Sequence, residues 1–290
     1  MTARTIGAPG LAPSLAPGLY VTATPIGNLK DITYRAVQTL QQVDLILCED
    51  SRISSRLCRA YDIRPQLKAY HDHNGDAMRP EVLRLLGEGK AIALISDAGT
   101  PLISDPGYKL VRAVRDAGFE IFTVPGPSAL TAALSIAGAP TDKFLFGGFL
   151  PAKQQARVTE LERHRHQTAT LVFYDTGPRL AASLAAIAEI WPGRQVAVAR
   201  ELSKMHEEVK EGSAETLAAT YHENGPPKGE IVIVLHPVSK PEWTHDAARA
   251  LLYDLLAHLS VKDAATEAAK QTGLPRKDLY TMALSLRGTA

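Results

Sequence analysis

The sequence predicts an α/β protein with mainly parallel sheets, and three observations support this fold class. Short apolar runs rich in β-branched residues recur along the chain, as expected of strands that are buried on both faces. Patterns with the apolar spacing of amphipathic helices lie between these runs. Loops of glycine, proline and small polar residues follow several of the runs. Because strands and helices alternate along the chain, we expect mainly parallel sheets.

The predicted strands and helices can be given in chain order. The apolar runs that we assign to strands are residues 19–21, 45–47, 91–95, 121–124, 171–174, 196–199 and 231–235. The helical patterns between the early strands are residues 35–43, 82–86 and 110–117. In the last of these, the apolar side chains fall on one face of the predicted helix.

We expect four segments along the chain. Residues 1–18 are rich in Ala, Pro and Gly without an apolar period, which predicts a flexible leader. Residues 19–138 and 139–238 are predicted to form two α/β domains, because the stretch from 138 to 151 breaks the alternating pattern. Residues 239–290 are predicted to be a C-terminal helix-turn-helix-like module.

The evidence for this C-terminal module is local. Ser260 followed by Asp263 has the spacing of a helix-capping signal. Gly273 is predicted to end that helix, and a second helix restarts at about Arg276. A helical cap that packs on the main body fits the same pattern, so both interpretations stay open at this point.

Composition narrows the class of protein. The chain has 290 residues, of which 45% are hydrophobic and 22% charged, as in ordinary folded soluble proteins. No apolar run approaches the roughly 18–20 residues that a membrane span needs, and the N-terminus does not have the layout of a secretory signal. Cys48 and Cys58 form neither a disulfide framework nor a metal-binding motif. We therefore expect a cytoplasmic protein without a membrane partner or a metal.

The formal net charge of +1 does not resemble that of a strongly basic nucleic-acid binder. Positive charge is nevertheless concentrated in three stretches. Their members are Arg52, Arg56, Arg59, Arg64 and Lys68; Lys153, Arg157, Arg163 and Arg165; and Lys262, Lys270, Arg276, Lys277 and Arg287. Each stretch taken alone is better explained as a solvated helix face.

Three loops at the ends of predicted strands indicate a ligand site. They span residues 22–31, 96–107 and 125–129. Ligands of parallel sheets bind beyond the carboxyl ends of the strands, and small residues let a ligand approach the backbone. The dinucleotide fingerprint and the Walker lysine motif are both absent from the sequence. An aspartate at a strand end suits S-adenosylmethionine (SAM), which carries a ribose, an ammonium and a sulfonium group.

Together these loops resemble the SAM-dependent tetrapyrrole methylase-like superfamily. Within it they resemble the ribosomal RNA small subunit methyltransferase I family, which methylates the 2′-hydroxyl of a cytidine in 16S ribosomal RNA. The stretches that carry this resemblance are LYVTATPIGNLKDIT (19–33), EDSR (49–52), HDHN (71–74), SDAGTPLISDPG (96–107), PGPS (125–128), GFLP (148–151), FY (173–174), AREL (199–202) and KGE (228–230). The resemblance covers roughly residues 19–290. Relatives often have Asp-Thr-Arg where this chain has Asp50-Ser51-Arg52, so the hydroxyl is kept.

The resemblance implies two α/β domains of the tetrapyrrole methylase type, with SAM in the cleft between them, and a small helical module at the C-terminus. It also implies a homodimer and a 16S rRNA or small-subunit substrate. The residues that it implies for the cofactor are Pro25, Asp97, Gly99, Ile103, Ser128, Ala129, Tyr174, Gly229, Glu230 and Ile231. Taken alone, Tyr174 would be read as a core residue.

The implied reaction is in-line attack of a ribose oxygen on the sulfonium methyl group, which requires no metal. Because a 2′-hydroxyl is a weak nucleophile, a general base is expected to assist it. The candidates for that base are Asp50, Glu49, His71 and His73. Glu49 and Asp50 equally fit a role at a helix start, and the two histidines equally fit a polar surface turn.

For the RNA we predict contacts from exposed polar and basic residues. They are Arg52, which is suited to a phosphate, with Asn74, Lys153, Lys262, Arg276 and Lys277. Two other functions stay open at this point. One is a tetrapyrrole C-methyltransferase that acts on a uroporphyrinogen or a precorrin, and the other is a non-catalytic RNA-binding factor in ribosome assembly.

Overall fold

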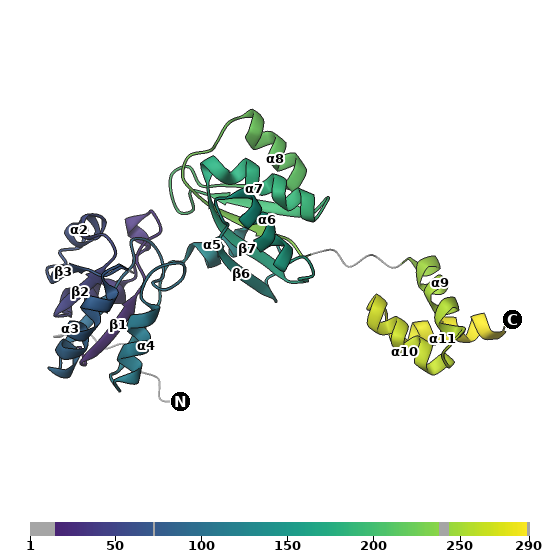
Figure 1. Ribbon diagram of the computed structural model, residues 1–290, viewed down its shortest axis with the longest axis horizontal. Helices are drawn as coiled ribbons and strands as arrows, with labels where there is room; N and C mark the ends of the chain where they lie inside the picture. Colours follow the sequence, from purple (N-terminus) through teal and green to yellow (C-terminus); the bar gives the residue numbers. More distant parts are fainter. Residues whose placement is uncertain (1–14, 72, 238–243, 289–290) are drawn as a thin grey trace. The chain divides into compact units, whose positions relative to one another are not determined.

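The computed structural model describes residues 15–71, 73–237 and 244–288 (Figure 1). The chain divides into two compact units, Met1–Pro237 and Val238–Ala290, and each is described by itself. Most of the predicted leader, residues 1–14, lies outside the described residues, as does the predicted boundary at 238/239. The division of the larger unit at 138/139 stays a prediction.

The N-terminal part of the larger unit is built on a five-stranded, fully parallel sheet in the order β3-β2-β4-β1-β5. Its strands are β1 (Gly18–Thr22), β2 (Leu45–Cys48), β3 (Gln66–Ala69), β4 (Ala91–Leu94) and β5 (Ile121–Val124). The segments between them are the 3-10 helix η1 (Leu29–Asp31), α1 (Tyr34–Gln42), α2 (Ser51–Ala60), α3 (Gly75–Gly87) and α4 (Tyr108–Asp116). Because all five strands run the same way, the loops after β1, β2 and β4 meet at one edge of the sheet.

Burial on both faces explains why these strands appear in the sequence as continuous apolar runs. Leu45 and Leu47 of β2 pack with α3 and α4 on one face of the sheet. Ile46 and Cys48 of the same strand pack with α1 and α2 on the other face. Because successive side chains of β2 point to opposite faces, this one strand packs against helices on both sides of the sheet.

The second sheet has five strands in the order β6-β7-β10-β8-β9. Its strands are β6 (Phe144–Phe149), β7 (Thr170–Thr176), β8 (Gln195–Arg200), β9 (Glu208–Ser213) and β10 (Glu230–Leu235). Only β6 and β7 pair in parallel; the pairs β7–β10, β10–β8 and β8–β9 are antiparallel. The predicted α/β class with two sheets is confirmed, but the expectation of mainly parallel pairing is wrong for this second sheet.

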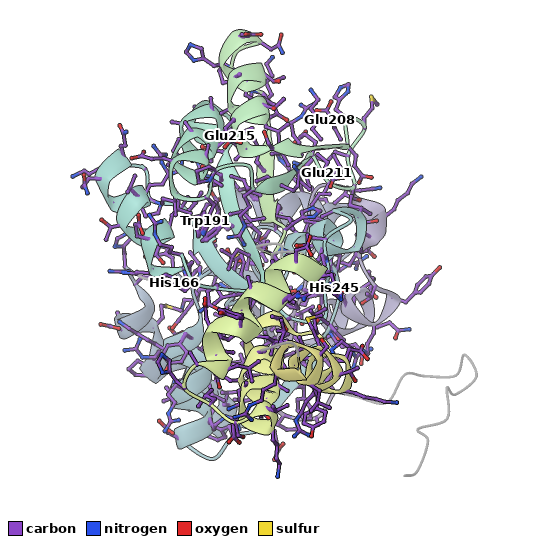
Figure 2. The ribbon with its side chains drawn as sticks, turned by 90° about the vertical axis from the view of Figure 1, so that its right-hand side faces the viewer. His166, Trp191, Glu208, Glu211, Glu215 and His245 are labelled. Atoms are coloured by element: carbon purple, nitrogen blue, oxygen red, sulfur yellow. The ribbon has the colours of Figure 1, made fainter. Side chains whose placement is uncertain are left out.

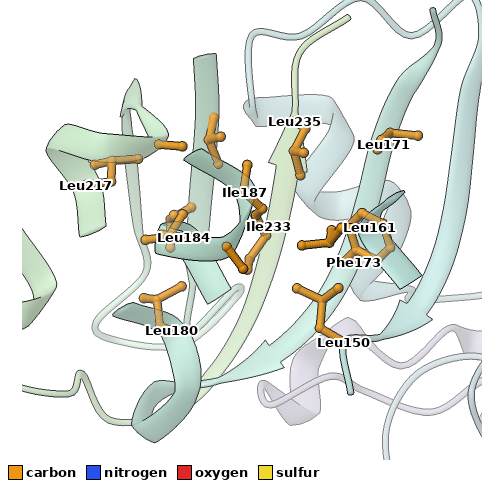
Figure 3. Close-up of a cluster of buried hydrophobic side chains, with 14 of the residues drawn as sticks. Leu150, Leu161, Leu171, Phe173, Leu180, Leu184, Ile187, Leu217, Ile233 and Leu235 are labelled. Atoms are coloured by element: carbon orange, nitrogen blue, oxygen red, sulfur yellow. The ribbon is translucent and has the colours of Figure 1, made fainter. Parts of the chain in front are cut away.

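Helices cover both faces of the second sheet. On one face α6 (Gln154–Arg163), α7 (Gly177–Ile190) and α8 (Ala214–Glu223) enclose a core that includes Phe173 and Ile233 (Figure 3). On the other face lies α5 (Ala129–Ile136), which follows β5 in the chain but packs against β10. Ile26, from the loop after β1, joins this same cluster, so the two sheets share a hydrophobic contact.

Residues of the turn between α7 and β8 make two polar contacts. Arg194 stacks over the ring of Trp191, with its guanidinium carbon 4.7 Å from the ring centroid. Glu215, at the start of α8 and labelled in Figure 2, accepts a hydrogen bond from the backbone N–H of Gly193. The length of this bond is 2.7 Å. Because Gly193 and Glu215 are 22 positions apart in the chain, their bond fixes the start of β8 next to α8.

The C-terminal unit is a bundle of three helices, α9 (His245–Leu256), α10 (Val261–Thr272) and α11 (Arg276–Gly288). They enclose their own core of Leu, Val and Ala side chains. The predicted capping signal is present, because Ser260 Oγ accepts a hydrogen bond of 3.2 Å from the N–H of Asp263. Gly273 ends α10 in the left-handed conformation at φ 72°, as expected.

None of the helices among the described residues is long and apolar enough to span a membrane.

Candidate active site

A cavity of about 330 Å³ lies where the ends of β1, β4, β7 and β10 approach one another. We call it the first cavity. Its wall contains residues from the loop after β4, from the start of α5 and from β10. The lining residues are Ile26, Asp97, Ala98, Gly99, Thr100, Ile103, Ser104, Asp105, Ser128, Ala129, Phe149, Tyr174, Asp175, Thr176, Leu202, Glu230, Ile231 and Val232. Both sheets therefore contribute to one site.

Strained backbone is concentrated beside this cavity. In the described part of the chain, five non-glycine residues have a positive φ. Leu102 (74°) and Ser104 (66°) lie in the loop after β4, and Glu201 (50°) and Ser203 (66°) lie in the loop after β8. Strain of this kind persists where the surrounding structure enforces it, and it clusters at functional sites.

Backbone hydrogen bonds fix the two loops of the first sheet to each other. Thr24 and Gly99 exchange N–H to carbonyl bonds of 2.8 and 3.1 Å, which form an isolated antiparallel bridge. Gly99 has a φ of +81°, and a Cβ there would lie 3.3 Å from Ile26. The loop therefore depends on glycine at this position.

Tyr174 holds the second sheet against the start of α5. Its hydroxyl oxygen accepts a hydrogen bond of 3.1 Å from the N–H of Leu130, in the first turn of α5. Ser128 precedes this helix as its N-cap residue but makes no side-chain capping bond. The tyrosine thus satisfies an amide that would otherwise have no partner at the helix start.

Carboxylates give the first cavity a negative lining. Burial raises the pKa of Asp105 to about 6, and the charges of Glu49 and Asp97 act in the same direction. Burial also raises the pKa of Asp97, assisted by the charge of Asp50 and opposed by a hydrogen bond from its backbone N–H. With Glu230 also in its lining, the cavity suits a ligand that carries positive charge.

The loop after β8 reaches across to the loop after β1. The Ser203 hydroxyl donates to the carboxylate of Asp31. Lys204 Nζ lies 3.0 Å from Glu201 and 3.1 Å from Glu230. A Cβ at Gly27 would lie 2.2 Å from Lys204 Cε, so the lysine stem crosses directly over this glycine. These contacts join the two sheets at the rim of the site.

The structure brings most of the residues predicted to bind a cofactor into one place. Those that line the first cavity are Asp97, Gly99, Ile103, Ser128, Ala129, Tyr174, Glu230 and Ile231. Pro25 instead lines an adjoining second cavity of about 290 Å³. Gly229 lines neither cavity; a Cβ there would lie 2.1 Å from Glu201 Oε1, and its φ is +98°.

The predicted general bases lie outside the linings of both cavities. Asp50 is the N-cap of α2, where its side chain accepts a hydrogen bond from the Arg52 N–H. Its carboxylate also pairs with the Arg52 guanidinium at 2.6 Å. Hydrogen bonds from Arg52 lower the pKa of Asp50 to about 2, which leaves it a weak base. The catalytic role of Asp50, like that of Glu49, stays a prediction.

His73 and Asn74 form a turn directly before α3, and His71 lies close to it in the chain. The backbone N–H of His71 donates to Asn74 Oδ1 at 2.9 Å, and Asn74 Nδ2 donates to the carbonyl of Ala69 at 2.9 Å. The rings of His71 and His73 meet edge to face, with centroids 5.9 Å apart. The Asn74 side chain is thus engaged within the turn, and the predicted roles of these residues stay predictions.

The basic residues predicted to contact RNA are exposed to solvent, but they differ in their ion pairs and hydrogen bonds. The Arg52 guanidinium is 89% exposed although it is paired with Asp50. Lys153 is exposed at the start of α6. Lys262, Arg276 and Lys277 are exposed in the C-terminal unit, where Arg276 Nε donates to Thr266 at 2.9 Å.

Asp105 and Lys204 are among the residues of this site that sequence reasoning missed. Asp105 lies within the motif SDAGTPLISDPG, so the signal was present although the residue was not singled out. No local pattern in the sequence marks Lys204, because its place depends on a contact with Gly27 across the two sheets.

Comparison with known families and proteins gives consistent results over nearly the whole chain. Residues 18–218 match the Tetrapyrrole (Corrin/Porphyrin) Methylases, and residues 244–287 match the RsmI C-terminal HTH domain. Proteins named ribosomal RNA small subunit methyltransferase I are similar throughout. The one from Erythrobacter litoralis is 49% identical, covering 95% of this chain and 98% of its own length. The one from Mesorhizobium japonicum is 46% identical, covering 95% and 94%.

Solved structures share the fold at low sequence identity. Diphthine synthase aligns with a TM-score of 0.59 and 14% identity, covering 75% of this chain and 89% of its own. The uroporphyrin-III-C-methyltransferase of Thermus thermophilus aligns with a TM-score of 0.54 and 20% identity, covering 75% and 94%. At these identities the likeness concerns the fold alone.

Proposed function

The chain belongs to the ribosomal RNA small subunit methyltransferase I family, and from this premise we propose that it transfers the methyl group of SAM to the ribose 2′-hydroxyl of a cytidine in 16S ribosomal RNA. We propose that the protein acts in the cytoplasm and that its substrate is free 16S rRNA or the small subunit. The relatives support an enzyme of this class, and neither the tetrapyrrole C-methyltransferase nor the non-catalytic factor is favoured.

The observation that carries this proposal is the carboxylate lining of the first cavity, beside the strained loop after β4. SAM carries an ammonium and a sulfonium, and Asp97, Asp105 and Glu230 offer negative charge to both. Ile103, Phe149 and Leu202 offer apolar surface to an adenine ring. Asp175, also in the lining, has a buried Oδ2 without a hydrogen-bond partner among the described residues, which a ligand N–H or O–H would satisfy. The residues present therefore fit SAM.

Bound SAM supplies a methyl group that is already activated for transfer. The residues of the chain hold the two reactants in line, which accounts for a large part of the rate. The loop from Asp97 to Asp105 is fixed by its bonds to Thr24, so it needs little rearrangement when the cofactor binds. We expect one of the predicted bases, Asp50, Glu49, His71 or His73, to take the hydroxyl proton as the new bond forms.

We propose that Tyr174, Ser128 and Ala129 position the cofactor from the side of α5, together with Gly99, Ile103 and the β10 residues Glu230 and Ile231. Pro25 and Gly229 support the same site through the loops that hold Ile26 and Glu201. The exposed basic residues of the C-terminal unit are proposed to hold RNA rather than to take part in the chemistry, and the protein is proposed to act as a homodimer. Among the described residues, no group of three or more His, Cys, Asp or Glu is arranged to hold a metal.

Transfer of tritiated methyl groups tests the proposal. The purified protein is incubated with labelled SAM and with 16S rRNA or small subunits from a strain that lacks the enzyme, and the labelled nucleotide is mapped by mass spectrometry. We expect label on one cytidine ribose. A spectral change with uroporphyrinogen instead of label on RNA would favour the tetrapyrrole function, and RNA binding without any label would favour the assembly factor.

A further inference from the structure

The second cavity adjoins the first and shares one wall with it. Four residues line both cavities: Ile26, Asp97, Ala98 and Glu230. The rest of the second cavity is formed by the loop after β1, by α2, by Ser96 and by Lys204. A group held in the second cavity would therefore face a ligand of the first cavity across Asp97 and Glu230.

The lining of the second cavity combines apolar surface with positive charge. Pro25, Leu29, Ile53 and Leu57 supply the apolar part. Ile53 is 44% exposed although it is a large hydrophobic side chain. The cations of this lining are Arg56 and Lys204. A nucleotide offers the matching pair of features, since its base has a flat face and its phosphate is an anion.

Ion pairing distinguishes Arg56 from three of the other four cations of its stretch. Arg52 pairs with Asp50, Arg64 with Asp62 and Lys68 with Glu81. Lys204 is held by two glutamates. Among the described residues, Arg56 forms no ion pair, and it is exposed at the mouth of the second cavity.

Arg56 also belongs to a larger basic surface. Arg52, Arg56 and Arg59 are spaced by four and three residues on α2, so they share one helix face. Arg59 donates to the carbonyl of Ser55 and does not pair with a carboxylate among the described residues. This face would guide the phosphates that flank a nucleotide in the second cavity.

We propose that the second cavity receives the acceptor nucleotide of the RNA as a single unstacked residue, with its phosphate on Arg56 and its base against the apolar face of α2. This inference rests on the proposed function and adds to it the site at which the substrate nucleotide binds. A concave site admits a base only after the base has left its stack. The ribose then lies at the shared wall, beside Asp97 and next to the cofactor.

Two substitutions in the full-length protein test the proposal. Arg56→Ala removes the cation, and Ile53→Trp fills the cavity from an exposed helix position. The control is Arg115→Ala, an exposed arginine on α4 that lines neither cavity. The measurements are kcat, KM for 16S rRNA, equilibrium binding of 16S rRNA and calorimetric binding of SAM.

We expect Arg56→Ala to raise the KM for RNA roughly tenfold. The slope of log affinity for RNA against log salt should become shallower by about 1. Ile53→Trp should raise the same KM, whereas SAM binding should be unchanged in both variants. Arg115→Ala should match the wild type in every measurement.

The proposal is overturned if the wild type methylates RNA while Arg56→Ala and Ile53→Trp behave like Arg115→Ala; the proposed function would then stand alone. If the wild type transfers no methyl group but its RNA binding still depends on Arg56 and Ile53, the proposed function fails and the nucleotide site stands. The site is also contradicted if every variant keeps the activity and the RNA binding of the wild type. It is contradicted as well if the wild type shows neither methyl transfer nor RNA binding.

Discussion

Asp97 Oδ1 accepts a hydrogen bond of 3.0 Å from the backbone N–H of Asp50, which joins the loop after β4 to the start of α2. The bond connects two adjacent strand ends of the parallel sheet. It also aims a carboxylate at the wall that separates the two cavities.

Asp97→Asn should keep the hydrogen bond to Asp50, because the amide oxygen still accepts it, but should remove the charge between the two cavities. We expect methyl transfer to fall by roughly 100-fold or more, and SAM binding to weaken because a negative neighbour of the sulfonium is lost. Asp142→Asn, an exposed aspartate outside both linings, is the matched control. Unchanged kcat in Asp97→Asn would show that its charge is not needed.

SAM binding should depend on pH through Asp105, whose pKa is raised to about 6. A cation prefers the ionised carboxylate, so SAM affinity should fall as the pH is lowered from 7 to 5. The amine of SAM, with an α-amino pKa of about 8, stays charged over this window. Calorimetry at several pH values measures the effect, and Asp105→Asn should give weaker binding that no longer changes with pH.

Asp105 should also affect the stability of the ligand-free protein, with a pH dependence opposite to that of SAM affinity. Because the pKa of Asp105 is higher in the folded protein than its ordinary value, the folded state holds this proton more tightly. The contribution of Asp105 to stability is therefore greatest below pH 4 and is lost as the pH rises through about 6. Asp105→Asn should raise the melting temperature at pH 8 relative to the wild type. A lower melting temperature at that pH would contradict the assignment.

Asp50 can be tested as a base and as a helix cap with two substitutions. Asn caps a helix as well as Asp does, whereas Ala does not. Asp50→Ala should lower the melting temperature by roughly 2–4 °C, and Asp50→Asn should leave it nearly unchanged. If Asp50 is the general base, both variants lose methyl transfer while SAM binding survives. Full activity of Asp50→Asn would reduce Asp50 to its capping role.

The C-terminal unit should bind RNA through its exposed lysines. The double substitution Lys262→Ala and Lys277→Ala should weaken binding to 16S rRNA and make its salt dependence shallower by about 2 in slope. SAM affinity should not change, because neither residue lines the first cavity. A salt titration identical to that of the wild type would remove this unit from RNA binding.

Burial decided how much of the fold could be predicted from the sequence. The seven apolar runs all lie in or overlap observed strands, because continuous burial leaves a clear pattern. The strands that the pattern missed, β3, β6 and β9, are edge strands and are only partly buried, whereas the edge strand β5 was predicted because its residues form an apolar run. The antiparallel direction of strands in the second sheet leaves no periodic signal in the sequence. The expectation of mainly parallel pairing was therefore wrong for that sheet.

The same contrast holds for the site. Loops with a long motif, such as the one from Ser96 to Gly107, could be predicted as a ligand site because small residues at strand ends converge by topology. Lys204 could not, since its position depends on packing over Gly27 from the other sheet. The capping position of Asp50 was one of two interpretations that the sequence left open, and its ion pair with Arg52 appears only in three dimensions.

Asp31 and Ser203, which are in contact, are 172 positions apart in the chain. β10, the last strand of the larger unit, provides Glu230, Ile231 and Val232 to the first cavity. During translation the first sheet can thus assemble once β5 has left the ribosome, while the cavity stays open until almost the whole unit has been made. A cofactor that needs the finished cavity would then give no help to the nascent chain and would stabilise only the completed protein.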